Sequence, residues 1–550
     1  MGHQRIDRSE WRWVALFASV VMLVTTIPYW LAWGEDGWLS GMGDLTFSGF
    51  FYGVEDGHSY LGKMRQGARG ELSFSLFYTS EAHEAEPLVF LPYLLPGWVV
   101  GRVIDSDDPA LTPALLGVFH LMRVVFGALM IAVIYAFVSR FLDQVRLRRL
   151  ALALGVFGGG LGIIQMLVLP GHTPLEMYTP EAASWLILLG IPHLALARAA
   201  LLGGLLALID AQDQPRWFGR VLIAGLCWLI TGLAVPFYLA ILYCIAGAWG
   251  LAALIRTRRF PTALFLRAAA ACGLTLPLFL HYAAIFTGNP AFVVWSVQNN
   301  LPSPPILDYL FTYGLIGVLA LIAFFRLPRE MERRFMLLIG WLAAVPFLVY
   351  LPINVQRRMS EAVLIPLAIF SAITLDRIRR LPRLVIIAAL CSSSVVLLAG
   401  NFFLTGDKTY PGFQPTARIA AFHWLSAHAE PGAVIMTAVE TGNALPAYAD
   451  LRVFMGHGPE TLYWLGKTAQ LEAFYESRMT DAEILDLARH PCAPSFECEG
   501  PLRYIYYGRD EGNPPADGAM PRWVQVLAPT LIYSQDGVDI YEVMSLPEAG

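Results

Sequence analysis

Long apolar runs separated by short loops constrain this chain more than any other feature. A run of about 20 apolar residues is long enough to cross the hydrocarbon core of a bilayer. Such runs recur from the N-terminus to about residue 405 of the 550-residue chain, and 56% of all residues are hydrophobic. This pattern excludes an ordinary soluble globule. It predicts a mainly α-helical, polytopic transmembrane bundle.

The basic residues between the runs predict how the bundle is oriented. Arg and Lys are enriched in cytoplasmic loops, and clusters lie near 5–12, 140–149, 256–259, 326–334 and 377–383. They place the N-terminus in the cytoplasm, with the first run as an uncleaved signal anchor. About eleven spans then leave the C-terminal region outside, whereas a single span at 221–255 would invert it. The predicted spans are 11–32, 112–139, 150–169, 183–209, 221–236, 237–255, 262–287, 307–325, 335–352, 360–376 and 384–405.

Two domains are expected. Residues 1–405 form the transmembrane domain, including a large outer loop at 34–110 with twelve acidic and four basic residues. Within that loop, 87–104 is apolar but short and interrupted by prolines, which favours a helix at the membrane surface. Residues 406–550 are more polar and predict an extracytoplasmic α/β domain. Its strands are expected at 433–438, 504–508 and 537–543, and its helices at 471–478 and 481–490.

The stretch VEDGHSYLGKMRQG, residues 54–67, carries the first chemical candidate. Asp56 precedes a helical pattern with Tyr60, Leu61, Met64 and Ala68 on one face, ending near Gly67 or Gly70. One interpretation is structural: Asp56 caps an amphipathic surface helix. The other is catalytic, because a helix N-terminus also keeps a carboxylate ionised and in place, as a general base requires.

Several arginines occupy positions where charge is costly. Arg123 and Arg198 lie inside predicted spans, where insertion of a basic group costs about 2.5–3.5 kcal/mol. Snorkelling towards the cytoplasm could explain Arg198. Arg357 and Arg358 lie at the outer end of a predicted hairpin, against the positive-inside trend. They suit a phosphate ligand, since guanidinium groups donate in pairs; the alternatives are a lipid contact or a salt bridge to Glu361.

The remaining polar candidates have structural explanations of equal weight. His83 and Glu86 belong to an acidic segment that could bind a divalent cation such as Mg²⁺ or Mn²⁺, although the spacing matches no metal motif. In TPEAASWLILLGIPH, Glu181 either caps the fourth span or contacts substrate, and His193 should face inward. Cys492 and Cys498 of the C-terminal region could form a disulfide if that region is exported.

Together these features resemble the GT-C superfamily of membrane glycosyltransferases. The chain shares with it a cytoplasmic N-terminus, an acidic first outer loop with a D-x-x-x-Y type motif, a buried arginine and an outward soluble tail. More closely, an ordered set of segments resembles predicted bacterial GT-C enzymes, distantly related to protein O-mannosyltransferases and aminoarabinose transferase. Those segments are EDGHSYLGKMRQG, FYTSEAHE, FHLMRVVFG, TPEAASWLILLGIPH, NVQRRM and ETGNALPAYADLRVFMGHGPET.

The resemblance implies a function and a set of site residues. The loop acid of these enzymes acts as the base, which implies Asp56, with Glu55 as the alternative because the acid-acid-x-Arg-Tyr form is not reproduced. Cavity arginines bind the phosphate of a polyprenyl-linked sugar, which implies Arg357, Arg358 and Arg123. The other candidates for substrate binding are His58, Tyr60, Glu181, His193 and His457.

The resulting expectation is inverting sugar transfer from a polyprenyl-phosphate donor to a lipid, glycan or protein acceptor. The reaction would take place on the outer face of the bacterial cytoplasmic membrane, with no nucleic-acid partner. Two other classes of function stay open. One is a transporter or flippase, in which buried charges line a path. The other is a non-catalytic envelope assembly protein.

Overall fold

The computed structural model describes residues 6–36, 44–326, 333–512 and 520–544. Arg5 and Arg329, members of the predicted basic clusters, lie outside these ranges. The chain divides into two compact units. Unit 1 comprises Met1–Pro28, His120–Ala283 and Asn300–Gly406, and unit 2 comprises Tyr29–Phe119, Ala284–Asn299 and Asp407–Gly550.

Unit 1 is built from helices. Four of them, α1, α4, α12 and α18, include residues of unit 2. The helices are α1 Arg8–Asp36, α4 Leu111–Val138, α5 Val145–Phe157, α6 Gly162–Val168, α7 Leu175–Tyr178, α8 Ser184–Gly190, α9 Pro192–Asp213, α10 Phe218–Ala234, α11 Tyr238–Thr257, α12 Thr262–Gly288, α14 Ile306–Arg326, α15 Arg333–Leu348, η1 Gln356–Ser360, α16 Leu364–Asp376, α17 Arg380–Leu390 and α18 Ser392–Asp407.

Each predicted span coincides with a helix or a helix pair. Among the described residues, seven helices are long and apolar enough to cross a membrane, and nine when two bent pairs each count as one span. The bent pairs are α5 with α6 and α17 with α18. The predicted spans at 221–236 and 335–352 are formed by the shorter helices α10 and α15.

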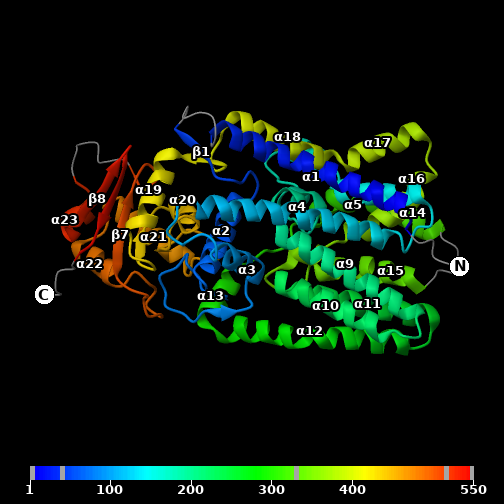
Figure 1. Cartoon of the computed structure of the whole chain (residues 1–550). Coiled ribbons are helices and arrows are strands. Elements are labelled where there is room, and N and C mark those ends of the chain that lie inside the picture. Colours follow the sequence, from blue (N-terminus) through cyan, green and yellow to red (C-terminus); the bar gives the residue numbers. More distant parts are fainter. Residues whose placement is uncertain (1–5, 37–43, 327–332, 513–519, 545–550) are drawn as a thin grey trace. The chain divides into compact units, whose positions relative to one another are not determined.

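The helices of unit 1 pack closely and bury charges in pairs. Helices α9 and α10 lie side by side (Figure 1). A Cβ at Gly204 of α9 would overlap the indole of Trp228 in α10, so a small residue permits the close approach of two helices. Arg148 of α5 pairs with Glu10 of α1 at 2.9 Å, and both side chains are buried. Pairing of this kind offsets the cost of removing a charge from water.

Unit 2 combines short strands with helices. Its strands are β1 Leu45–Phe47, β2 Ser73–Phe74, β3 Glu86–Pro87, β4 Phe413–Pro415, β5 Val434–Met436, β6 Arg452–Val453, β7 Leu502–Tyr507, β8 Thr530–Gln535 and β9 Val538–Glu542. Its helices are α2 Val54–Ala68, α3 Leu91–Val100, α13 Pro290–Gln298, α19 Thr416–His428, α20 Val439–Ala444, η2 Leu445–Ala447, α21 Trp464–Tyr475, α22 Asp481–Arg489 and α23 Arg522–Leu527.

A mixed five-stranded sheet organises the C-terminal part of unit 2. Its strand order is β6-β5-β7-β9-β8. Strand β5 runs parallel to β6 and β7, while β9 runs antiparallel to β7 and β8. Side chains such as Met436, Phe474, Ile505 and Trp523 pack between this sheet and α21 to α23. The region is therefore the predicted α/β fold (Figure 1).

Helices α2 and α3 pack backbone against backbone. A Cβ at Gly67 of α2 would overlap the carbonyl of Leu94, and one at Gly97 of α3 would overlap the carbonyl of Met64. Eleven of the fifteen residues of α2 are buried, so the prediction of a surface helix is wrong. The helix also continues through Gly67 to Ala68, because Gly67 serves this contact and does not end the helix.

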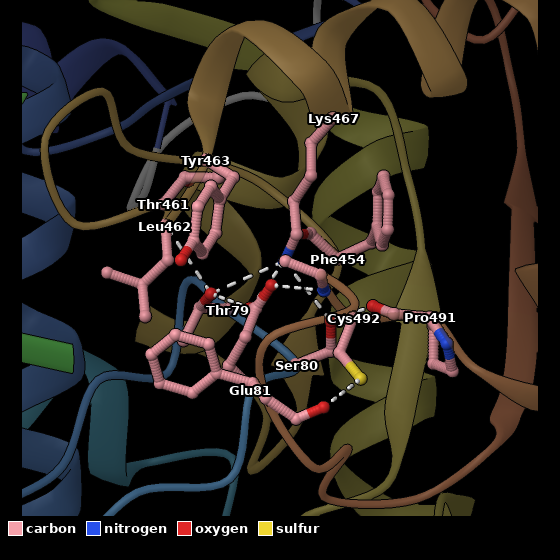
Figure 2. Close-up of polar contacts among 12 residues, drawn as sticks. Thr79, Ser80, Glu81, Phe454, Thr461, Leu462, Tyr463, Lys467, Pro491 and Cys492 are labelled. Atoms are coloured by element: carbon pink, nitrogen blue, oxygen red, sulfur yellow. Dashed lines mark hydrogen bonds and ion pairs between the residues drawn. The ribbon is translucent and has the colours of Figure 1, made fainter. Parts of the chain in front are cut away.

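A disulfide loop closes onto the segment between β2 and β3. Cys492 and Cys498 are disulfide-bonded, and Glu81 forms a β-bridge with Cys498. Glu81 also accepts from the backbone N–H of Ala493 at 2.9 Å. It pairs with Lys467 of α21 at 2.6 Å (Figure 2). These contacts join the first predicted outer loop to the C-terminal part of the chain.

Candidate active site

Asp56 lies in the first turn of α2. The helix begins at Val54 after Gly53, which occupies the N-cap position in the left-handed conformation at φ +58°. Glycine adopts that conformation without the strain a side chain would add. The interpretation of Asp56 as the N-cap is therefore wrong. Its carboxylate instead benefits from the positive end of the helix dipole, and 58% of its side chain is exposed.

His457 is the side chain that approaches Asp56. It follows β6 in the turn Gly456–Glu460, and its Nε2 lies 3.3 Å from Asp56 Oδ1. The ring stacks on Tyr78 with centroids 5.5 Å apart, and Tyr78 in turn donates to the Asn443 carbonyl at 2.8 Å. Only 12% of the His457 side chain is exposed. The structure thus brings together two predicted site residues that are 401 positions apart.

Behind His457 lies a buried ion pair. Glu460 Oε1 is 3.8 Å from His457 Nδ1. The same carboxylate pairs with Lys63 of α2, whose Nζ lies 2.8 Å from Oε1 and 3.1 Å from Oε2. Ser59 donates to it at 3.1 Å. Lys63 and Glu460 were not predicted as site residues, although both lie in segments that resemble GT-C enzymes.

This arrangement sets the charge on His457. Burial lowers its pKa, but the hydrogen bond with Asp56 and the negative charges of Glu460 and Asp56 outweigh burial, so the pKa is raised. The imidazole therefore holds its proton to higher pH than an isolated histidine does. The positive charge of Lys63 opposes this effect without reversing it.

His58 and Tyr60, also on α2, contact protein groups. His58 Nδ1 donates to the Asn443 amide oxygen at 3.0 Å, and Asn443 Nδ2 donates to the Glu55 carbonyl at 3.3 Å. Burial lowers the pKa of His58 to about 4, so the ring is neutral at pH 7. Tyr60 stacks on Tyr93 of α3 with centroids 4.4 Å apart. Glu55 is exposed.

The acidic segment predicted to bind a cation is engaged in protein contacts. His83 Nε2 accepts from the Leu76 backbone N–H at 2.8 Å, and its Nδ1 lies 2.8 Å from the Glu81 carbonyl. Glu86 accepts from Asn289 at 2.7 Å. The described residues contain no group of three or more His, Cys, Asp or Glu side chains placed to hold a metal ion. A divalent cation stays a prediction.

The predicted phosphate ligands lie in unit 1. Arg357 and Arg358 belong to η1 and are half-buried. The Arg357 guanidinium lies 5.0 Å from the Tyr178 ring centre. Arg358 Nε lies 3.7 Å from Glu181 Oε1. Glu181 is fully buried, and neither carboxylate oxygen has a hydrogen-bond partner among the described residues.

Arg198 and Glu361 form a buried pair that changes two expectations. Arg198 of α9 donates to both Glu361 oxygens at 2.6 and 2.7 Å, and its side chain is 1% exposed. It does not snorkel, because the carboxylate compensates its charge inside the unit. Tyr238 also donates to Glu361, at 2.8 Å. The carboxylate considered as a salt-bridge partner for Arg357 and Arg358 is thus bound by Arg198 and Tyr238.

The other unit 1 candidates differ in their surroundings. Glu181 is not a helix cap, since Ala183 is the N-cap of α8. Arg123 of α4 is buried and donates to Thr26 at 2.7 Å and to the Leu188 carbonyl at 3.2 Å. It therefore connects three helices of the unit. His193 lies half-buried in the first turn of α9, which begins at Pro192.

Similarity to solved structures extends over nearly the whole chain. The crystal structure of ArnT from Cupriavidus metallidurans bound to undecaprenyl phosphate aligns with 98% of this chain and 99% of its own, with a TM-score of 0.52 and 12% identity. Its apo form aligns with 96% and 97%, at the same TM-score and identity. The chain has the fold of the GT-C membrane glycosyltransferases. The predicted fold class is confirmed.

A second solved protein shows the same architecture. The Archaeoglobus fulgidus oligosaccharyltransferase tethered to an acceptor peptide aligns over 96% of this chain and 74% of its own, with a TM-score of 0.51 and 13% identity. No protein-family model matches the sequence, and no curated protein matches it at the significance required. The apolar helices and the shared fold make the chain a multi-pass membrane protein.

Proposed function

We propose that the chain is an inverting membrane glycosyltransferase with Asp56 as its general base. The donor would be a sugar linked to a polyprenyl phosphate, and the acceptor a hydroxyl group of a lipid, glycan or protein. The observation that carries the assignment is the Asp56 carboxylate, which is exposed in the first turn of α2 and held by His457. The GT-C fold supports it, since solved neighbours include a complex with undecaprenyl phosphate.

Each of these charged groups has one role in the proposed reaction. The acceptor oxygen attacks the anomeric carbon while Asp56 takes the hydroxyl proton, a contribution of about 10²–10⁴ in rate. The bond between the anomeric carbon and the phosphate oxygen breaks with inversion, and polyprenyl phosphate leaves. Arg357 and Arg358 stabilise the negative charge that develops on that phosphate. A lipid-linked donor suits a reaction outside the cytoplasm, where nucleotide sugars are absent.

The proposed location follows from the distribution of basic residues. The clusters near 140–149, 256–259 and 377–383 indicate cytoplasmic loops by the positive-inside rule. The N-terminus then lies in the cytoplasm of a bacterial cell, and Asp56 and the C-terminal α/β fold lie on the outer side of the cytoplasmic membrane. The Cys492–Cys498 disulfide supports an oxidising, extracytoplasmic location for this region.

Substitution of Asp56 tests the function directly. Mass spectrometry of envelope glycans and lipids identifies the product lost in a deletion strain, and variants are then expressed at equal levels in that strain. Asp56→Asn should restore less than about 1% of the product, because an amide cannot accept the proton. Glu55→Gln is the matched control on the neighbouring exposed acid and should restore it fully. Normal product with Asp56→Asn would refute the assignment.

The donor site is tested by binding of undecaprenyl phosphate to the purified protein. A hydrogen bond to a charged group is worth about 1.5–3 kcal/mol, so Arg357→Ala should weaken binding about 10- to 150-fold. Arg358→Ala should have a similar effect. Arg380→Ala, at an exposed arginine of α17, is the control and should bind normally. Equal affinity in all three variants would remove the phosphate role from the pair.

A further inference from the structure

The two ring nitrogens of His457 each face a carboxylate. Nε2 is 3.3 Å from Asp56 Oδ1, and Nδ1 is 3.8 Å from Glu460 Oε1. A neutral imidazole carries one N–H and one lone pair. In this position the lone pair would point at a negative oxygen on one side or the other. Only the doubly protonated ring offers a positive N–H to both sides.

We propose that His457 is a positioning residue for the candidate base: as an imidazolium it holds Asp56 through Oδ1 in one orientation for the acceptor hydroxyl. Glu460 and Lys63 form the support behind it. The proposal rests on the proposed function, since it assigns a role within that site. It adds a charged side chain from the C-terminal part of the chain, His457, to the candidate base Asp56 on α2.

The surroundings of His457 on every side fit this role. From α2, Asp56 faces Nε2, and Lys63 lies behind Glu460. From its own turn, Glu460 faces Nδ1. The Tyr78 ring covers one face, and the Tyr78 hydroxyl is occupied by the Asn443 carbonyl. The four charged groups, Asp56, Glu460, Lys63 and an imidazolium, sum to zero, whereas a neutral ring would leave the group with a net charge of −1.

The arrangement also explains how an exposed carboxylate can be held in one orientation. With 58% of its side chain exposed, Asp56 is constrained little by packing. An imidazole that is 12% exposed and stacked on Tyr78 cannot follow rotation of that side chain. The Asp56 oxygen that contacts it is therefore fixed, and the second oxygen points to one direction. Orientation of this kind lowers the entropy cost of the proton transfer.

Exchange of the imidazole Cε1 proton for deuterium tests the proposal without any enzymatic assay. Its rate follows the protonation of the ring, and mass spectrometry of tryptic peptides reads it for single histidines of the full-length protein in detergent. Peptide 453–467 contains only His457, and peptide 490–503 contains only His490. His490 is the matched control, because it contacts one carboxylate, Asp486, on the exposed surface at 3.2 Å.

The expected result is an exchange midpoint for His457 at higher pH than that for His490. Asp56→Asn and Glu460→Gln should each lower the His457 midpoint and leave the His490 midpoint in place, which also shows that the variants are folded. A His457 midpoint no higher than that of His490, or one unmoved in both variants, would overturn the proposal. The function of Asp56 would survive that outcome if Asp56→Asn still lost the envelope product.

Product formation by His457 variants tests positioning separately from folding. Glutamine keeps an N–H that can donate to Asp56, whereas alanine does not. His457→Gln should therefore restore several-fold more product than His457→Ala when both accumulate equally in membranes. Equal loss in the two variants would contradict a role in holding Asp56. Normal product with Asp56→Asn would instead refute the proposed function. If the His457 exchange midpoint still shifted in that variant, the ion pair between His457 and Asp56 would be supported.

Discussion

At the scale of single residues, the buried pair of Lys63 and Glu460 near Asp56 is costly to break. Lys63 is fully buried, and its ammonium lies 4.1 Å from the centre of the Phe90 ring. Lys63→Met keeps the apolar stem but removes the cation that lies 2.8 Å from the buried Glu460 carboxylate. Breaking a buried pair by removing one partner costs about 3–5 kcal/mol. We expect the free energy of unfolding in urea to fall by that amount.

The double variant Lys63→Met, Glu460→Gln is the control for this prediction. It removes both charges, so it should be more stable than Lys63→Met alone. If the double variant were the less stable of the two, the loss in Lys63→Met could not be attributed to an unpaired Glu460. The comparison therefore separates the charge effect from the packing of α2.

From the sequence, the residues of the site could be predicted individually, but not as contacting pairs. Asp56 stands out because two adjacent acids at a helix start are unusual in an apolar chain. The contact with His457 spans 401 positions and that of Lys63 with Glu460 spans 397. No local pattern encodes such distant pairs. For the same reason, the sequence suggests Arg357 and Arg358 as salt-bridge partners of Glu361, whereas the structure pairs Glu361 with Arg198.

At the scale of elements, the contact of α2 with α3 depends on glycine. Gly97 faces the Met64 carbonyl with no space for a Cβ. Gly97→Ala should therefore destabilise the protein by about 1–3 kcal/mol through overpacking, despite the higher helix propensity of alanine. Gly117→Ala in α4 is the matched control, since nothing lies within 4 Å of its Cβ position. That variant should be as stable as the parent or more so. Thermal unfolding followed by circular dichroism compares them, and equal melting temperatures would contradict the contact.

Elements with strong local patterns were predicted better than those that depend on partners. The strands β5, β7 and β9 and helix α22 fall where alternation or helical spacing places them. Strand β6 has two residues and exists because β5 lies beside it. Strand β8 is largely exposed, so its sequence lacks the alternation of a half-buried strand. The burial of α2 was missed because its polar residues Lys63, Arg65 and Gln66 find partners inside the unit.

At the scale of the whole molecule, hydropathy was sufficient to predict the helical bundle. The apolar runs coincide with helices because a bilayer leaves no other way to satisfy the backbone of a single segment. Hydropathy does not predict that 29–119 and 407–550 belong to one compact unit. That grouping depends on contacts such as the β-bridge of Glu81 with Cys498 and the pairing of β1 with β4. Each joins segments more than 300 positions apart.

The orientation of the whole chain gives the last prediction. With an N-terminus in the cytoplasm and about eleven spans, the loop after α11 lies inside and the β8–β9 hairpin outside. A membrane-impermeant maleimide applied to spheroplasts should therefore label Ser534→Cys but not Arg259→Cys, both of which are exposed positions. After membrane disruption both should react. The parent chain, whose four free cysteines are half-buried, provides the background. Labelling of Arg259→Cys alone would invert the topology and place Asp56 in the cytoplasm, where a nucleotide-linked donor would become the better expectation.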